Sequence, residues 1–209
     1  VYDCKKKESI YEKNIGIEDA RNIINYLISN KYRFVAYSSS TMYYFLLNEE
    51  IEKKIQRVKK FEVDQQSNNL LYTKNINSVD DVDNISKLLK IVIYLENNSD
   101  ISGIYPNIKN ENVRFEQTGE RYWSVCHKLA SKDNGLKYLQ KYLFINSEKT
   151  IAFGDFDNDI SLFKRAKYKV AMSNASDSLI LCSNFMTDSN ENDGVAKFVS
   201  NKILQNSIK

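Results

Sequence analysis

The residues best suited to chemistry lie in residues 151–163, where IAFGDFDNDISLF joins a short apolar run to an acidic segment. Asp155, Asp157 and Asp159 supply three carboxylates within five residues, and Asn158 adds an amide oxygen. Hard oxygen ligands at this density favour Mg²⁺ over a soft metal. The sequence therefore predicts a magnesium site. The competing interpretation is an acidic helix N-terminus that is stabilised by the helix dipole alone.

A buried parallel strand followed by a helix would position these carboxylates. Open α/β sheets bind their ligands at the carboxyl ends of the strands. From residue 131 onward, helix and strand candidates alternate strictly: DNGLKYLQKYL, TIAFGD, NDISLFKRA, YKVAMSN, ASDSLILCS, NFMTDSN and a last helix from Gly194. Strands joined by single crossover helices form a parallel sheet. We therefore expect an α/β fold class here, with part of a Rossmann-like sheet.

The region before residue 127 has a different pattern. VYD and SIYEK form a predicted hairpin around KKKE, and Gly119 with Glu120 form a predicted turn. Residues 17–30 place Ile17, Ala20, Ile24, Leu27 and Ile28 on one helical face. A charged helix is predicted at 49–61, and strands are predicted at 32–38, 88–95, 112–118 and 121–128. This pattern indicates an α+β layer, a sheet with helices on one side.

Composition excludes several classes of protein. The 209 residues are 42% hydrophobic and 12% aromatic, enough for a packed core. The 30 basic and 27 acidic side chains are interspersed, so no nucleic-acid footprint is present. Three widely spaced cysteines, Cys4, Cys126 and Cys182, argue against a disulfide framework and for a reducing compartment. The longest apolar segment is too short to span a membrane. We expect a cytoplasmic protein that binds neither nucleic acid nor membrane.

Four ordered motifs resemble one known family. GDFDND at 154–159 resembles the fourth signature of haloacid dehalogenase superfamily phosphatases, and VAMSNA at 170–175 resembles the strand and turn that follow it in the Cof-type branch. NDGVAKFV at 192–199 and ASKDNGLKYL at 130–139 are similar to the same branch in order and spacing, and the latter supplies its lysine as Lys132. The resemblance implies that 1–9 end a first core segment and lead into the cap, that 10–126 form an α+β cap domain, and that 127–209 form the C-terminal half of the core.

The resemblance also implies a phosphoric monoester hydrolase that removes phosphate from a small metabolite, such as a sugar phosphate. The chemistry runs through an aspartyl-phosphate and needs a nucleophilic carboxylate, a second aspartate as general acid and base, a cation and Mg²⁺. The nucleophile belongs to a DxDxT-like signature, which we expect upstream of Val1. DVDNI at 81–85 lacks the preceding apolar strand and the following threonine, and SSST at 38–41 is predicted to be a surface loop. The chain alone is therefore expected to be inactive, with a missing N-terminal core segment as a partner.

By the same resemblance, Asp155 is expected to bind the metal, and Asp159 to hold a metal-bound water or a backbone amide. The alternative for Asp159 is a first-turn carboxylate. Asn158 is expected to donate to a phosphate oxygen at the helix N-terminus. Lys132 stands at the start of a helix, where the dipole disfavours a cation, so it needs an anionic partner, and a phosphoryl group of the substrate together with an aspartate would serve. The alternative for Lys132 is an exposed lysine on a turn. Asp157 is expected to be only solvated.

Structural roles are also predicted for two further residues and for one strand. His127 is interpreted as a surface or hinge residue, and Trp123 as core packing. Without a neighbouring first strand, TIAFGD would present an unpaired apolar edge, which is an aggregation hazard. The alternatives to an enzyme are a non-enzymatic phospholigand-binding or regulatory protein, and an interaction module built on the cap sheet.

Overall fold

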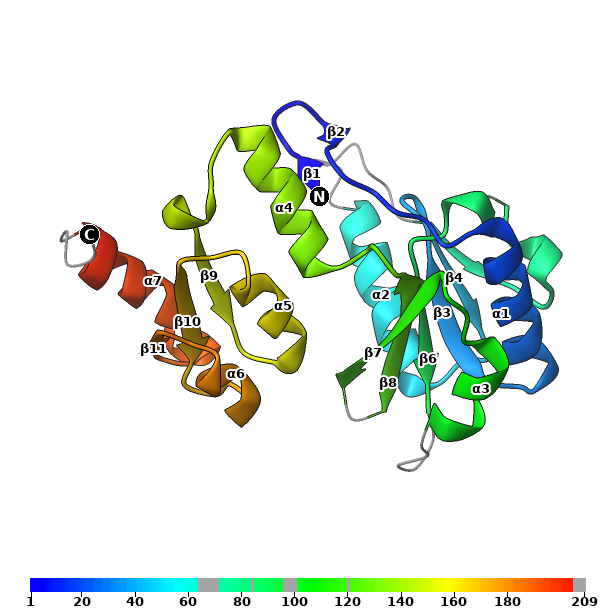
Figure 1. Cartoon of the computed structure of the whole chain (residues 1–209). Coiled ribbons are helices and arrows are strands. Elements are labelled where there is room, and N and C mark those ends of the chain that lie inside the picture. Colours follow the sequence, from blue (N-terminus) through cyan, green and yellow to red (C-terminus); the bar gives the residue numbers. More distant parts are fainter. Residues whose placement is uncertain (64–71, 84, 96–100, 120, 205–209) are drawn as a thin grey trace. The chain divides into compact units, whose positions relative to one another are not determined.

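The computed structural model describes residues 1–63, 72–83, 85–95, 101–119 and 121–204. The chain divides into two compact units (Figure 1). Unit 1 comprises Val1–Tyr11 and Ser131–Lys209, and unit 2 comprises Glu12–Ala130. In the described residues, no helix combines the length and the apolar character needed to cross a membrane. Each unit has its own sheet and its own buried core.

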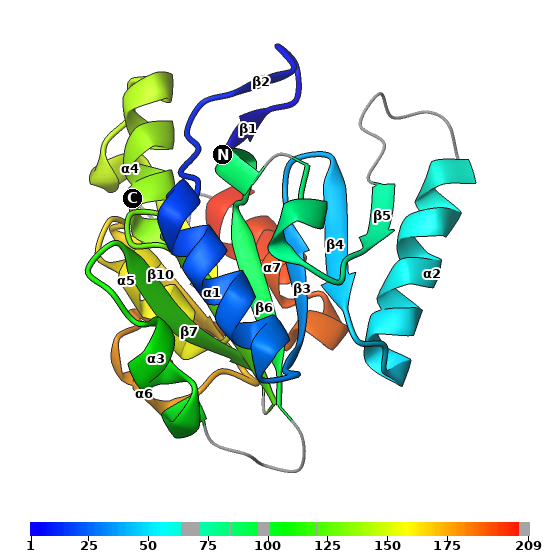
Figure 2. The ribbon, with the colours of Figure 1, turned by 90° about the vertical axis from the view of Figure 1, so that its right-hand side faces the viewer.

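Unit 2 is built on a six-stranded sheet in the order β5-β4-β3-β6-β8-β7. The strands β5, β4, β3 and β6 lie side by side in Figure 2. Only the β4–β5 pair is parallel, and the other pairs are antiparallel. The bounds are β3 Arg33–Tyr37, β4 Thr41–Phe45, β5 Tyr72–Asn75, β6 Lys90–Tyr94, β7 Val113–Gly119 and β8 Tyr122–His127. The four predicted strands are confirmed, whereas β4 and β5 were not predicted.

Short turns connect the antiparallel strands. Ser38 is buried, and its Oγ accepts hydrogen bonds from the backbone N–H groups of Ser40 (3.3 Å) and Thr41 (3.0 Å). This turn joins β3 to β4, so the prediction of a surface loop at 38–41 is wrong for Ser38 and for Thr41, which begins β4. Of the predicted turn between β7 and β8, Gly119 ends β7 and Glu120 lies outside the described residues.

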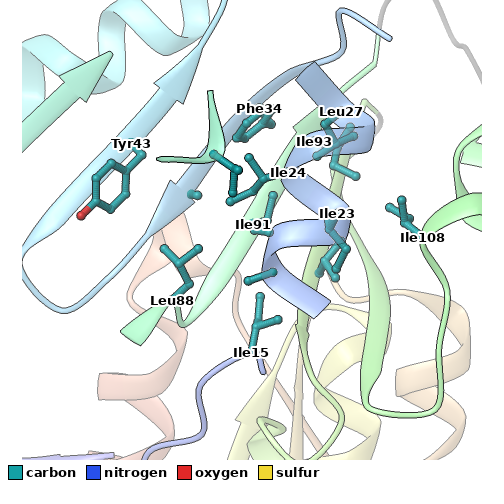
Figure 3. Close-up of a cluster of buried hydrophobic side chains, with 14 of the residues drawn as sticks. Ile15, Ile23, Ile24, Leu27, Phe34, Tyr43, Leu88, Ile91, Ile93 and Ile108 are labelled. Atoms are coloured by element: carbon teal, nitrogen blue, oxygen red, sulfur yellow. The ribbon is translucent and has the colours of Figure 1, made fainter. Parts of the chain in front are cut away.

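Helix α1 (Ile17–Ser29) covers one face of this sheet. Figure 3 shows its apolar side, with Ile23, Ile24 and Leu27 in the same cluster as Phe34 and Ile91. The short helix α3 (Tyr105–Ile108) adds Ile108 to this cluster. The predicted apolar face of α1 is therefore the core face. Its first member, Ile17, is an exception at 49% exposure, because it lies in the first turn, at the helix end.

Helix α2 (Glu49–Val63) covers the opposite face (Figure 1). Its Ile51 and Ile55 pack with Val35 and Val92, which alternate along their strands with the residues that face α1. The prediction of helices on one side of the sheet is therefore wrong. The reason is the parallel β4–β5 pair, because parallel neighbours need a crossover connection, and α2 lies in that connection.

Unit 1 contains a parallel three-stranded sheet in the order β11-β10-β9. The strands are β9 Ile151–Gly154, β10 Tyr168–Met172 and β11 Phe185–Thr187. The helices are α4 Lys132–Leu143, α5 Ile160–Phe163, α6 Asp177–Leu181 and α7 Gly194–Phe198, followed by a π-helical segment at Val199–Leu204. The predicted alternation and parallel pairing are confirmed. Within the described residues, β9 pairs with β10 alone and is an edge strand.

The two faces of the unit 1 sheet are covered by different helices. On one face, Ala152 of β9 packs with Phe163 and with Leu179 of α6. On the other face, the rings of Phe153 and Phe185 meet the ring of Phe198 edge-on, at centroid distances of 5.6 and 5.7 Å. The sheet is thus sandwiched, which fixes the direction in which β9 delivers the acidic segment that follows it.

The N-terminal hairpin is confirmed, although its second strand is Glu8–Ser9 and not the predicted segment 9–13, and it belongs to unit 1. β1 (Tyr2–Asp3) and β2 (Glu8–Ser9) pair in antiparallel fashion. The ring of Tyr11 stacks on that of Tyr138 of α4 at 4.2 Å, and the hydroxyl of Tyr142 donates to Oδ2 of Asp3 at 2.6 Å. These contacts attach the hairpin to α4, the helix that begins with Lys132.

Candidate functional site

The acidic segment forms a tight turn at the carboxyl end of β9. The strand ends at Gly154, a 3₁₀ turn spans Asp157–Asp159, and α5 begins at Ile160. A Cβ atom on Gly154 would lie 2.6 Å from the Cβ of Asp159, far inside a normal contact distance. Glycine is required at this position because the turn folds Asp159 back against the end of the strand.

Asp159 is the buried centre of this turn, with 4% exposure. Its Oδ2 accepts hydrogen bonds from the backbone N–H groups of Asp155 (3.2 Å) and Phe156 (3.5 Å). Its Oδ1 forms an ion pair with Nζ of Lys132. The carboxylate therefore holds the backbone of the turn with one oxygen and a cation with the other.

Lys132 is the first residue of α4, directly after the N-cap Ser131, whose Oγ accepts a hydrogen bond from the N–H of Asn134 at 3.2 Å. The anionic partner expected for a lysine at this end of a helix is Asp159. The Nζ of Lys132 also donates to Oδ1 of Asn158 at 3.4 Å. An ammonium group has three N–H donors, so these two contacts leave one for a further acceptor. The side chain of Lys132 is 47% exposed and accessible to a ligand.

Asp155 lies one residue beyond β9 and is exposed. Its backbone is held on both sides, because its N–H donates to Asp159 and its carbonyl accepts from the N–H of Ser176 at 3.1 Å. Within the described residues, no donor is bonded to its carboxylate. A free, exposed carboxylate at a strand end is suited to a hard cation.

The fit to Mg²⁺ differs between the two predicted metal residues. Asp155 has an uncommitted carboxylate, whereas both oxygens of Asp159 are engaged by Lys132 and by the backbone. Among the residues that the structure describes, no group of three or more histidine, cysteine, aspartate or glutamate side chains is placed to hold a metal ion. The described residues thus contribute one suitable ligand and do not form a full coordination sphere.

Asp157 is bonded, and the prediction that it is only solvated is wrong. Its Oδ1 accepts hydrogen bonds from the hydroxyls of Ser176 (2.6 Å) and Ser178 (2.5 Å). These two bonds hold the pKa of the Asp157 carboxyl below its ordinary value. Sequence reasoning missed both serines. Their position in ASDS, at the start of the predicted helix after β10, indicates a helix cap and gives no sign of a distant acidic partner.

Two other predicted residues lie in unit 2. Trp123, in β8, is partly buried and packs against the core on the α1 face, as predicted. His127 ends β8, and its Nδ1 accepts a hydrogen bond from the N–H of Leu129 at 3.0 Å. Burial and the nearby cations of Lys13 and Lys128 lower the pKa of His127.

The fold and this site describe an α/β protein with an acidic, lysine-paired corner at the end of a parallel strand. The family model of haloacid dehalogenase-like hydrolases matches residues 1–199. The chain therefore belongs to the haloacid dehalogenase-like hydrolases. By family, it is a phosphoric monoester hydrolase.

Relatives and solved structures agree with this assignment. A Mycoplasma pneumoniae protein with a provisional phosphatase name is 25% identical over 207 residues, which cover 95% of this chain and 72% of that protein. The structure of a haloacid dehalogenase-like hydrolase from Bacteroides thetaiotaomicron superposes with a TM-score of 0.72 at 20% identity, covering 94% of this chain and 70% of that one. A subclass IIB sugar phosphatase of the superfamily gives a TM-score of 0.70 at 20% identity, covering 93% and 70%. These structural likenesses define the fold.

Proposed function

We propose that this protein acts in the Mg²⁺-dependent hydrolysis of a small phosphate monoester, such as a sugar phosphate, in the cytoplasm. The observation that carries the proposal is the uncommitted carboxylate of Asp155 beside the Lys132–Asp159 ion pair. The sugar phosphatase among the structural neighbours supports the substrate class. The three cysteines are all free, which supports a reducing compartment.

Each residue of the corner has a distinct role in this proposal. Asp155 would bind the magnesium ion, which when bound neutralises charge on the phosphoryl group. Lys132 would donate its remaining N–H to a phosphoryl oxygen, and Asp159 would orient the lysine through its ion pair. Asn158, whose amide oxygen already meets Lys132, would offer its amide N–H groups to the phosphate.

Two parts of the proposal concern the rest of the protein. The aspartyl-phosphate route needs a nucleophilic aspartate, and we place it in a segment outside these 209 residues. Unit 2 would be the cap domain that selects the substrate, with residues 10–126 as its expected extent and Glu12–Ala130 as the compact unit. The proposed substrate is a small phosphorylated metabolite, with no role for nucleic acid or membrane.

The test combines metal binding with turnover. Binding of Mn²⁺, a paramagnetic substitute for Mg²⁺, is measured by electron paramagnetic resonance on the 209-residue chain, and hydrolysis of p-nitrophenyl phosphate is measured with Mg²⁺. We expect no turnover and only weak Mn²⁺ binding, because the described residues supply one suitable ligand, and Asp155→Ala should abolish that binding. Glu148→Ala is the matched control, because Glu148 is an exposed carboxylate of unit 1 that pairs with Lys167 at 3.0 Å. Turnover that disappears in Asp155→Ala would show that a nucleophile exists within this chain.

A non-enzymatic phospholigand-binding protein is the second candidate. It is favoured by the single suitable metal ligand among the described residues. The two candidates differ in the chain extended by its encoded upstream residues. A DxDxT signature there with restored hydrolysis supports the enzyme. Tight phosphate binding that depends on Lys132 but not on Mg²⁺, without hydrolysis, supports the binding protein.

A further inference from the structure

Unit 2 contains a partly buried cation that has no anionic partner. Lys54 lies in α2, and its ammonium lies over the ring of Tyr94, 5.1 Å from the centroid. The centroid of the Tyr122 ring is 5.9 Å away, and the two rings meet edge-on at 5.1 Å. In the described part of the chain, no carboxylate forms an ion pair with Lys54. The ammonium therefore lies against two aromatic rings without a counter-ion.

The carboxylate that could pair with Lys54 is bonded elsewhere. Glu50 precedes Lys54 by four residues, a spacing at which opposite charges on a helix usually meet. Glu50 instead accepts a hydrogen bond from the guanidinium of Arg121 at 2.9 Å. Burial lowers the pKa of the Lys54 ammonium, the charges of Lys90 and Arg57 also lower it, and Glu50 opposes them. Four cations, Lys54, Arg57, Lys90 and Arg121, thus share one carboxylate.

Lys90 faces the same side of the sheet as Tyr94. The two residues are four apart in β6, side chains alternate along a strand, and Val92 between them packs against α2. Lys54 and Lys90 are partly exposed, and Arg57 is exposed. Among the residues that the structure describes, no carboxylate pairs with Lys90 or Arg57. A small solute can therefore reach cations that the chain itself leaves without partners.

The hydroxyl of Tyr94 also has no partner within the described residues. Tyr94 is only 4% exposed. A buried O–H group that is left unpaired costs free energy, so it is expected to meet an acceptor from outside the chain. The same tyrosine thus supports an unpaired ammonium with its ring and carries an unpaired hydrogen-bond donor.

We propose that Lys54, Arg57 and Lys90, called the α2 cation cluster below, bind a phosphate group of a small solute on the α2 face of the unit 2 sheet. The excess of positive charge favours a phosphate over a carboxylate, because a phosphate monoester carries about two negative charges at neutral pH and a carboxylate carries one. Lysine and arginine N–H groups form short, strong hydrogen bonds with phosphate oxygens. The inference does not depend on the proposed function, because these residues belong to unit 2 and the acidic corner belongs to unit 1.

The test is a titration of the 209-residue chain with inorganic phosphate, followed by the NMR signals of the backbone amides. Low ionic strength is used, because salt screens partly exposed charges. The amides of α2 and β6 report on the α2 cation cluster, and the amides of the turn after β9 report separately on Lys132. We expect the signals of α2 and β6 to shift. Acetate, which carries one charge, should bind there more weakly than phosphate.

Lys54→Met tests the role of the ammonium, because methionine keeps much of the apolar stem and removes the charge. We expect about tenfold weaker phosphate binding at α2 and β6, the size expected for one charge-assisted hydrogen bond. Lys54→Arg, which keeps a cation, should retain the affinity. Lys59→Met is the control, since Lys59 is an exposed lysine of the same helix that is not among the charges acting on Lys54. The urea midpoint of Lys54→Met should not fall, because the change relieves repulsion between cations.

Three results would overturn the α2 cation cluster. They are unchanged α2 and β6 signals in the presence of phosphate, unaltered affinity in Lys54→Met, and equal affinities for phosphate and acetate. A lower urea midpoint in Lys54→Met, with binding not restored in Lys54→Arg, would assign Lys54 to folding and would also overturn the cluster. The Mn²⁺ experiment on Asp155 tests the proposed function separately, so either inference can fail while the other stands.

Discussion

The ammonium of Lys132 is paired with the carboxylate of Asp159, whose side chain is only 6% exposed. A buried carboxylate needs a cation or hydrogen-bond donors, because burying its charge without such partners is costly in free energy. The partners of Asp159 are one cation and two backbone N–H groups. The pair therefore joins the start of α4 to the turn after β9, and it has both a structural role and a place in the proposed chemistry.

Replacing Lys132 with alanine should destabilise unit 1, because it leaves a buried carboxylate without its cation. We expect a loss of about 1–2 kcal/mol, reduced from the value for a fully buried pair because the Lys132 side chain is 47% exposed. Urea unfolding followed by circular dichroism measures this loss. Lys137→Ala, which removes an exposed lysine of the same helix, should have almost no effect. Equal midpoints for the two variants would contradict the structural role.

Gly154→Ala should distort the acidic turn. The added Cβ would lie 2.6 Å from the Cβ of Asp159 and 3.1 Å from its Oδ2, so the turn or the strand must shift. We expect a loss of about 1–3 kcal/mol in unfolding free energy, together with loss of Mn²⁺ binding. Gly103→Ala is the control, since an added Cβ there meets nothing within 4 Å. If Gly154→Ala retained both stability and metal affinity, the observed close approach would be incorrect.

Stability of unit 2 should fall as the pH drops through the ordinary pKa of histidine. The pKa of His127 is lowered from 6.5 by burial and by Lys13 and Lys128, and Asp19 opposes this with a smaller effect. The unfolded chain therefore takes up the proton at a higher pH than the folded chain, so the free energy of unfolding falls as the pH drops from the unfolded-state pKa to the folded-state pKa and stays lower below it. His127→Asn, whose side-chain oxygen can replace Nδ1 as an acceptor, should remove this contribution.

The measurement is the urea midpoint at pH 7.5 and pH 5.5. Trp123, the only tryptophan, lies in unit 2 and reports its unfolding by fluorescence. The fall in midpoint should be smaller in His127→Asn than in the unaltered chain. The same pH dependence in both would show that His127 has similar pKa values in the folded and unfolded states.

Truncating a core residue of α1 should strongly destabilise unit 2. Ile24 is fully buried among the residues in Figure 3, so Ile24→Ala removes apolar contacts and leaves a cavity. We expect a loss of about 2–5 kcal/mol. Ile17→Ala is the control. Because Ile17 is 49% exposed, its truncation leaves no cavity and should cost about 0.5 kcal/mol or less. Trp123 fluorescence during urea unfolding compares the two variants.

Local patterns in the sequence predicted most of the fold. The alternation of short apolar runs with helical periods predicted the parallel pairing of β9, β10 and β11, and the dipole argument at Lys132 required an anionic partner, found in Asp159. The placement of α2 could not be predicted in the same way. It depends on β5 pairing in parallel with β4, and neither strand has a strong apolar alternation to reveal it.

The unpredicted part of the site depends on contacts between distant residues. Asp157 and its partners Ser176 and Ser178 are 19 and 21 residues apart in the chain, and they meet only because β9 and β10 are neighbours. Composition and spacing describe Asp157 as an exposed aspartate. The hydrogen bonds that restrain it become visible only once the two strands are paired.

In the part of the chain that the structure describes, β9 has no strand on the side away from β10, and this has a geometrical consequence for the acidic corner. A further strand running parallel to β9 along that side would bring its own carboxyl end next to Asp155. Any oxygen ligands or nucleophile carried there would arrive in the same step that pairs the backbone of β9 on that side. Under the proposed function, completing the sheet and completing the catalytic centre would then be a single assembly event.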